Sequence, residues 1–205
     1  MIRSTAFHMA GAGLACALLS GCALLSTPDP VQTYRFGGAP AASPAVASTA
    51  APVQVLLRRI EFPQATEGDK ILGVTGSGTA YIKGARWISD ARDLYTASLE
   101  SAFAAQSSRV RLIGLREVTP ATRALALDVR AFEARYPAPG AAPTVVVIVR
   151  ARMVALPSRS VAAERVFTVE RRATANRVSA IVEAFDVATH DINAEIVAWS
   201  EASAA

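Results

Sequence analysis

Cysteine and histidine are scarce in this chain of 205 residues, which has two of each. The cysteines are Cys16 and Cys22, and the histidines are His8 and His190. This scarcity excludes a metal site built from clustered Cys and His ligands, because such sites need several of them at set spacings. The sequence also has no Gly-x-Ser-x-Gly and no His-Glu-x-x-His motif. It therefore offers little support for an enzyme.

Lysine is equally rare, since Lys70 and Lys83 are the only lysines among 21 basic residues. The net charge of +4 thus comes almost entirely from arginine, whose guanidinium pairs well with phosphate. The basic residues are nevertheless interleaved with acidic ones, as at Arg58 and Arg59 beside Glu61, and they form no patch-length run. We expect no nucleic-acid partner.

Acidic residues are absent before Asp29, and this first part of the chain has the features of an export signal. It opens with Met-Ile-Arg, and residues 9–19 contain only Ala, Gly, Leu, Cys and Met. A basic start followed by an apolar stretch and small residues is typical of a secretory signal peptide. The apolar stretch is too short and too rich in glycine to span ~30 Å of hydrocarbon.

The tetrapeptide Leu-Ser-Gly-Cys at residues 19–22 resembles the lipobox of bacterial lipoproteins. This resemblance implies cleavage before Cys22, diacylglycerol on its thiol and an acyl chain on its new amino group. Each buried methylene contributes ~0.8 kcal/mol, so two or three chains should anchor the protein firmly in a membrane. The alternatives are plain secretion with Cys22 incidental, or acylation at Cys16, where Gly13 stands in the position of Leu. We expect residues 1–21 to be a signal peptide, and no cofactor apart from the acyl chains.

Residues 22–52 are predicted to carry the lipidated cysteine and a tether. They are rich in Pro, Ala, Ser and Thr, and such a composition buries too little apolar surface to offset the entropy of ordering. Tyr34 and Phe36 mark the one place in this segment that is suited to a short strand. The folded domain is expected over residues 53–205.

The first half of the expected domain combines strands with one helix. Alternating apolar residues begin at Val53 and predict a strand. The glycine-rich segment 73–78 is expected to be a turn, because it lacks the spacings of a phosphate-binding loop. A helix is predicted to follow an N-cap at Ser89 or Asp90 and to end near Ser107.

The second half is predicted to be a strand meander closed by a helix. Strand patterns cover residues 110–113, 125–136, 145–153 and 165–172, and the short loops between the last three favour antiparallel pairing. An apolar stripe from Val178 to Trp199 predicts a final amphipathic helix. We expect one compact α/β domain, in which a mixed, largely antiparallel sheet is covered by two amphipathic helices.

The order of these segments resembles the ABC-type transport auxiliary lipoprotein family, often called PqiC-like. The most specific match is Tyr-Ile-Lys-Gly-Ala-Arg-Trp at residues 81–87, which leads into the predicted helix. Tyr34 also fits the family's short segment after the anchor, although Phe36 replaces the usual Leu. None of these motifs is catalytic. The resemblance implies a periplasmic lipoprotein that works with an ABC permease, an ATPase and an MCE-domain protein to move lipids between membranes.

Ala23 bears on localisation, because many Gram-negative bacteria retain a lipoprotein in the inner membrane when Asp follows the lipidated cysteine. The presence of Ala23 in place of Asp favours the outer membrane. Two alternatives for function stay open from the sequence. One is an outer-membrane assembly or stability lipoprotein with no ABC transporter, and the other is a lipid carrier that holds phospholipid in a cavity of its own.

Candidate contact residues lie around the segment that carries the resemblance. Tyr81, Arg86 and Trp87 belong to it, and Tyr136 begins the apolar loop that ends at Pro143. Trp and Arg are common at the energetic centres of interfaces. For Trp87 the alternative is a buried ring that fixes the start of the helix onto the sheet.

Three polar residues of the last predicted helix form a second candidate set. Glu183, Asp186 and His190 fall within a narrow arc and would make a weak metal site, or part of a periplasmic hydrolase. A solvated helix face explains the same spacing, because acid and His pairs at i,i+3 and i,i+4 are common on such faces.

Overall fold

The chain folds into a mixed sheet and two helices. The computed structural model describes residues 31–38 and 51–203, and Val31–Ala205 form one compact unit. The helices are α1 (Ala91–Gln106) and α2 (Val178–Ser203). The strands are β1 (Gln32–Tyr34), β2 (Val53–Leu57), β3 (Lys70–Thr75), β4 (Gly78–Trp87), β5 (Val110–Ile113), β6 (Arg123–Tyr136), β7 (Thr144–Ala155) and β8 (Ser160–Arg172).

Strand β6 organises the sheet because it pairs along both of its sides. On one side it pairs antiparallel with β7, which pairs antiparallel with β8, and each ladder joins twelve residue pairs. On its other side β6 pairs with two strands: its start pairs parallel with β2 and its end pairs parallel with β3. The sheet continues from β2 to β5 and from β3 through β4 to β1. The long ladders are antiparallel and the short additions mostly parallel, which confirms the predicted mixed, largely antiparallel sheet.

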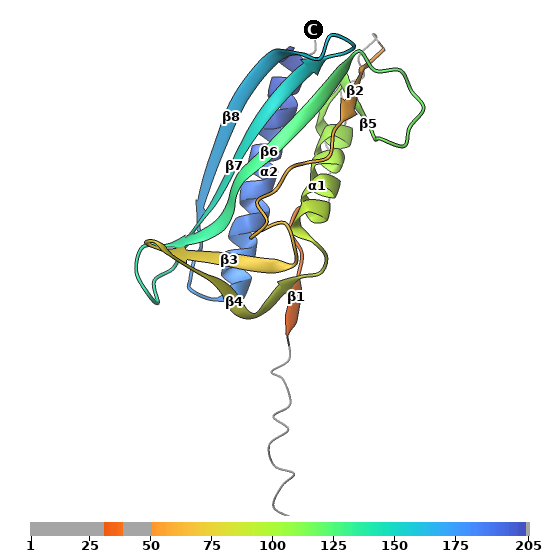
Figure 1. The fold of residues 1–205 in the computed structure, drawn as a ribbon. Coiled ribbons are helices and arrows are strands. Elements are labelled where there is room, and N and C mark those ends of the chain that lie inside the picture. Colours follow the sequence, from red (N-terminus) through yellow and green to blue (C-terminus); the bar gives the residue numbers. More distant parts are fainter. Residues whose placement is uncertain (1–30, 39–50, 204–205) are drawn as a thin grey trace, which may run out of the picture. The chain divides into compact units, whose positions relative to one another are not determined.

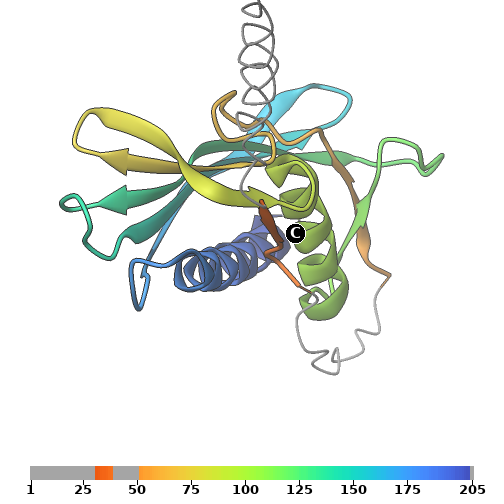
Figure 2. The same ribbon diagram turned by 90° about the horizontal axis from the view of Figure 1, so that it is seen from below.

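Both helices cover the same face of the sheet (Figures 1 and 2). Helix α2 packs on β7 and β8, and α1 packs on α2. Apolar residues recur on α2 every three or four positions and so lie on one face of the helix. This face is buried and includes Ile181, Phe185, Ile192 and Ile196. Asp90 precedes α1 at the expected N-cap position, but its carboxylate makes no capping hydrogen bond. In the part of the chain that the structure describes, no helix is long and apolar enough to cross a membrane.

The predicted turn at residues 73–78 is a tight hairpin between β3 and β4. Thr75 pairs with Gly78, so Gly76 and Ser77 form a two-residue connection. Such connections need a positive φ, which glycine adopts at little cost, and Gly76 has a φ of 56°. Strand β8 begins at Ser160, earlier than the predicted start at residue 165.

The folded unit starts earlier than residue 53. Strand β1 pairs parallel with β4, and Tyr34 lies opposite Trp87. Phe36 is only 2% exposed and belongs to the hydrophobic core. The folded unit therefore begins about twenty residues before the start expected from composition, because Gln32–Tyr34 belong to the sheet and Phe36 belongs to the core.

Candidate contact sites

Of the candidate residues, Trp87 lies in the core. Its side chain is 2% exposed, and its ring packs edge-on against Phe36 at 4.8 Å and against Phe185 at 5.3 Å. Phe132 completes this group, with its centroid 5.0 Å from that of Phe36. Trp87 therefore fixes the end of β4 and the start of α1 onto the sheet, and it is not a surface contact. These rings fill the space between sheet and helices in which a carried lipid would have to lie.

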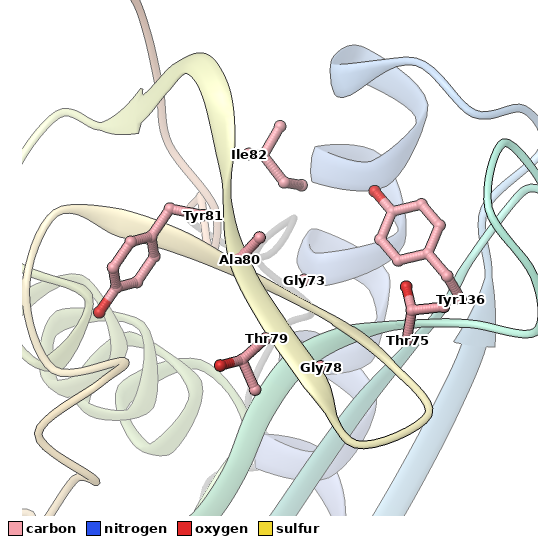
Figure 3. Close-up of a pocket in the computed structure, with 8 residues that line it drawn as sticks. All are labelled: Gly73, Thr75, Gly78, Thr79, Ala80, Tyr81, Ile82 and Tyr136. Carbon is pink, nitrogen blue, oxygen red and sulfur yellow. The ribbon is translucent and has the colours of Figure 1, made fainter.

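Tyr136 lines an apolar hollow of about 400 Å³ at the β3–β4 hairpin (Figure 3). The floor of the hollow consists of small residues, and Ile82 stands at its rim. The Tyr136 ring lies over Gly73, where an added Cβ would come within 3.1 Å of Tyr136 Cε2. Partial burial raises the pKa of the Tyr136 phenol, which keeps it neutral. The hollow has no charged lining residue, so it suits an apolar side chain or acyl group.

Tyr81 lies on the other side of the hairpin from Tyr136 (Figure 3). Its hydroxyl donates to the carbonyl of Ala65 at 3.2 Å, and Lys70 Nζ stands 4.8 Å from its ring centroid. Arg86, exposed on β4, forms an ion pair with Asp69 at 3.0 Å. Of the four candidates, Trp87 thus lies in the core, while Tyr136 and Tyr81 both line the hollow. The ring of Tyr81 points away from Tyr136 (Figure 3), and Arg86 is exposed farther along β4.

Asp186 and His190 bind the chain's own backbone. Asp186 Oδ1 accepts the N–H of Gly37 at 2.7 Å, and His190 Nε2 lies 2.9 Å from the carbonyl oxygen of Gly38. His190 Nδ1 is 3.5 Å from Asp186 Oδ2, while Glu183 is exposed. Among the described residues no group of three acid, His or Cys side chains could hold a metal ion. On α2, Asp186 and His190 are thus part of a clamp that holds the N-terminal segment.

Helix α1 forms the other half of this clamp. Gly37 passes so close to Ser98 that a Cβ on Gly37 would lie 2.4 Å from Ser98 Cβ. Ser98 is buried and accepts a hydrogen bond from Asn193 Nδ2 at 3.0 Å, which joins the two helices directly behind the segment. We call residues 36–38, together with Ser98, Asp186 and His190, the N-terminal clamp. Sequence reasoning missed it, although the apolar step from Tyr34 to Phe36 followed by two glycines was a signal.

Cys22 and the rest of residues 1–30 lie outside the described part of the chain. Lipidation at Cys22 thus stays a prediction from the lipobox. The structure describes where the chain that follows it enters the domain, at Val31 directly before β1.

The sequence from Tyr34 in β1 to Val197 in α2 has a family match. Residues 34–197 match the family described as the ABC-type transport auxiliary lipoprotein component. The chain belongs to this family. The match begins in β1, so it includes the N-terminal clamp.

Solved structures share the fold. Protein XCC0632 from Xanthomonas campestris is 23% identical and superposes with a TM-score of 0.70, over 84% of this chain and 96% of that one. The hypothetical protein CT253 from Chlamydia trachomatis is 12% identical with a TM-score of 0.52, over 75% of this chain and 98% of that one. Identities this low show a common fold alone. No curated protein matches the chain.

Proposed function

We propose that this family member is a non-enzymatic, membrane-anchored subunit of an MCE-type ABC system that moves lipids between the two envelope membranes. The observation that carries the proposal is the family match, which runs from the last residue of β1 to Val197 and so includes α1, strands β2 to β8 and most of α2. The lipobox at residues 19–22 agrees with the lipoprotein character of the family. The permease, the ATPase and the MCE-domain protein are the proposed partners.

In this proposal the protein works through its anchor and its surfaces. The acyl chains on Cys22 hold it in the membrane, and Ala23 favours the outer membrane. The hollow beside Tyr136 is the proposed contact for a protein partner, because it is apolar, uncharged and open to solvent. The loop of residues 137–143 follows Tyr136 directly and would enlarge that contact.

Site-specific photo-crosslinking in the native envelope tests the docking site. A photoreactive amino acid at Thr75, which lines the hollow, should crosslink to an MCE-domain or permease subunit. The same amino acid at Val166 is the matched control, since Val166 is 49% exposed on β8, away from the hollow. Equal crosslinking at both positions, or none to a transport subunit, would contradict the proposed site.

A further inference from the structure

The N-terminal clamp limits how far the folded unit can lie from a lipid anchor at Cys22, and the inference below rests on that proposed anchor. Val31 follows Cys22 by nine residues. A fully extended chain spans at most ~3.5 Å per residue, so Val31 lies within about 30 Å of the acylated residue. If the folded unit began at residue 53, the same reasoning would allow about 110 Å. The clamp therefore keeps the β1 end of the domain close to the membrane.

The surface at this end combines basic and apolar side chains. Val31, Tyr81 and Ile88 are 48%, 46% and 59% exposed, so three of the exposed large apolar residues lie at this end of the molecule. They lie on or beside β1 and β4, and the amide of Ile88 donates to the Tyr34 carbonyl at 2.7 Å. We define the β1–β4 face as the exposed residues of this surface, namely Val31, Arg35, Lys70, Tyr81, Lys83, Arg86 and Ile88.

The charge of the β1–β4 face is mainly positive. It has four basic residues, which include both lysines of the chain. Acidic residues near it in the described part of the chain include Asp69, which pairs with Arg86, and Asp90 at the start of α1, and Asp29 precedes Val31 by two residues in the sequence. Lys70 lies over the ring of Tyr81 and forms a cation–π contact with it. At a bilayer surface, cations pair with lipid phosphates, while aromatic and aliphatic groups enter the boundary between headgroups and acyl chains.

The geometry points to the β1–β4 face as a membrane-contacting surface that lies on anionic phospholipid headgroups. The clamp and the short chain before Val31 place this face near the bilayer, and its side chains suit that surface. Arg86 and the Tyr81 ring, which points away from Tyr136 (Figure 3), then contact lipid, whereas the side of the hollow next to Tyr136 stays available to a protein. The C-terminal end of α2 and the β7–β8 turn lie at the opposite end of the domain from β1 (Figure 1), so in this arrangement they face away from the bilayer.

Single-cysteine labelling of the lipidated full chain tests this inference. The sequence makes the design simple, because Cys16 leaves with the signal peptide and Cys22 is acylated. A nitroxide or fluorescent label is placed at Ile88→Cys and, as the matched control, at Val161→Cys, which is 51% exposed at the start of β8. Each protein is reconstituted in vesicles of phosphatidylethanolamine and phosphatidylglycerol at 3:1. Accessibility to a water-soluble quencher is compared with quenching by a lipid-soluble one.

We expect the label at Ile88→Cys to be at least threefold less accessible to the water-soluble quencher than the label at Val161→Cys. Charge reversal by Arg35→Glu with Lys70→Glu should remove this protection, whereas Arg116→Glu with Arg159→Glu should leave it. Equal accessibility of the two labels on vesicle-bound protein would overturn the inference. Protection that arises only when a partner protein is added would also overturn it, because the face would then be a protein interface. A protein that fails to float with the vesicles would instead count against the lipid anchor itself.

Discussion

At Gly37 the backbone passes so close to α1 that a side chain has no room. The residue has a φ of 65°, and a Cβ would meet both Cβ and Oγ of Ser98 at 2.4 Å. We predict that Gly37→Ala lowers the free energy of unfolding by about 1–3 kcal/mol, since it combines a left-handed backbone with a steric clash. Gly38→Ala is the matched control, because no atom lies within 4 Å of its added Cβ. Urea denaturation of both variants measures the difference, and equal losses would contradict the clamp.

Glu201 ties the end of α2 to the turn between α1 and β5. Its Oε1 accepts the amides of Ser108 at 2.8 Å and Arg109 at 3.0 Å, and the hydroxyl of Ser107 at 3.0 Å. Burial acts to raise its pKa and is the largest single influence, but the three hydrogen bonds prevail and hold the pKa below its ordinary value. The charged carboxylate thus stabilises the folded state above the pKa of the unfolded chain, and this contribution is lost as the pH falls through the folded pKa.

We therefore predict that Glu201→Gln destabilises the protein at pH 7 and makes its stability less sensitive to acid. The free energy of unfolding, measured by urea denaturation at pH 7 and again near pH 3.5, should fall less in Glu201→Gln than in the wild type. Glu195→Gln on the exposed face of the same helix is the control and should behave like the wild type. An acid response that is identical in wild type and Glu201→Gln would show that these hydrogen bonds contribute nothing.

Single residues also show where sequence reasoning reaches its limit. The i,i+4 spacing of Asp186 and His190 places both on one helix face, and this much follows from the sequence. Their partners are the backbone atoms of Gly37 and Gly38, which lie about 150 residues earlier. No local pattern encodes such a contact, so the sequence suggested a metal site, part of a hydrolase or a solvated face instead. Burial of Trp87, in contrast, followed from its place directly before a helix.

Among the elements, β1 is the shortest described strand, and Phe36, two residues after its end, contributes an aromatic side chain to the core. We predict that Phe36→Ala lowers the free energy of unfolding by about 3–5 kcal/mol, because it leaves a cavity among Trp87, Phe132 and Phe185. The emission of Trp87 should shift to longer wavelength as water reaches its ring. Fluorescence and urea denaturation together measure both effects.

Tyr34→Ala is a suitable comparison for this variant. Tyr34 is the last residue of β1, two residues before Phe36, and is only partly buried, so its loss should be clearly smaller. A Phe36→Ala protein with wild-type emission and stability would mean that residues 31–38 are not part of the core in solution.

The elements differ in how far the sequence predicts them. Long segments with strong periodicity, such as β6, β7 and α2, were predicted closely, and their short loops indicated the antiparallel meander. The parallel pairings of β6 with β2 and β3 were not predicted, because they join distant segments without a tight turn. Strand β1 was assigned to the tether because three residues in a Pro- and Ala-rich stretch carry almost no periodic signal. The first part of β8, Ser160-Val161-Ala162-Ala163, lacks alternation, so its start was not predicted.

For the whole molecule, the proposed lipid anchor at Cys22 decides whether the folded unit can act at a membrane. We predict that Cys22→Ala abolishes incorporation of radiolabelled palmitate and that Cys16→Ala leaves it unchanged, since only Cys22 follows a lipobox. Labelling in the native host, followed by immunoprecipitation, measures both. If Cys22→Ala still incorporates palmitate, another residue must carry the acyl chain. The limit on the distance between Val31 and the membrane would then have to be calculated from that residue.

The central claim is that the anchored domain is an adaptor within an ABC lipid transport system. Its most direct test is affinity purification of the wild-type lipoprotein from crosslinked envelopes, with Cys22→Ala as the comparison. We predict that the wild type brings down an MCE-domain protein with its permease and ATPase, and that Cys22→Ala recovers much less of them. Isolation of the crosslinked wild type free of all three subunits would contradict the claim.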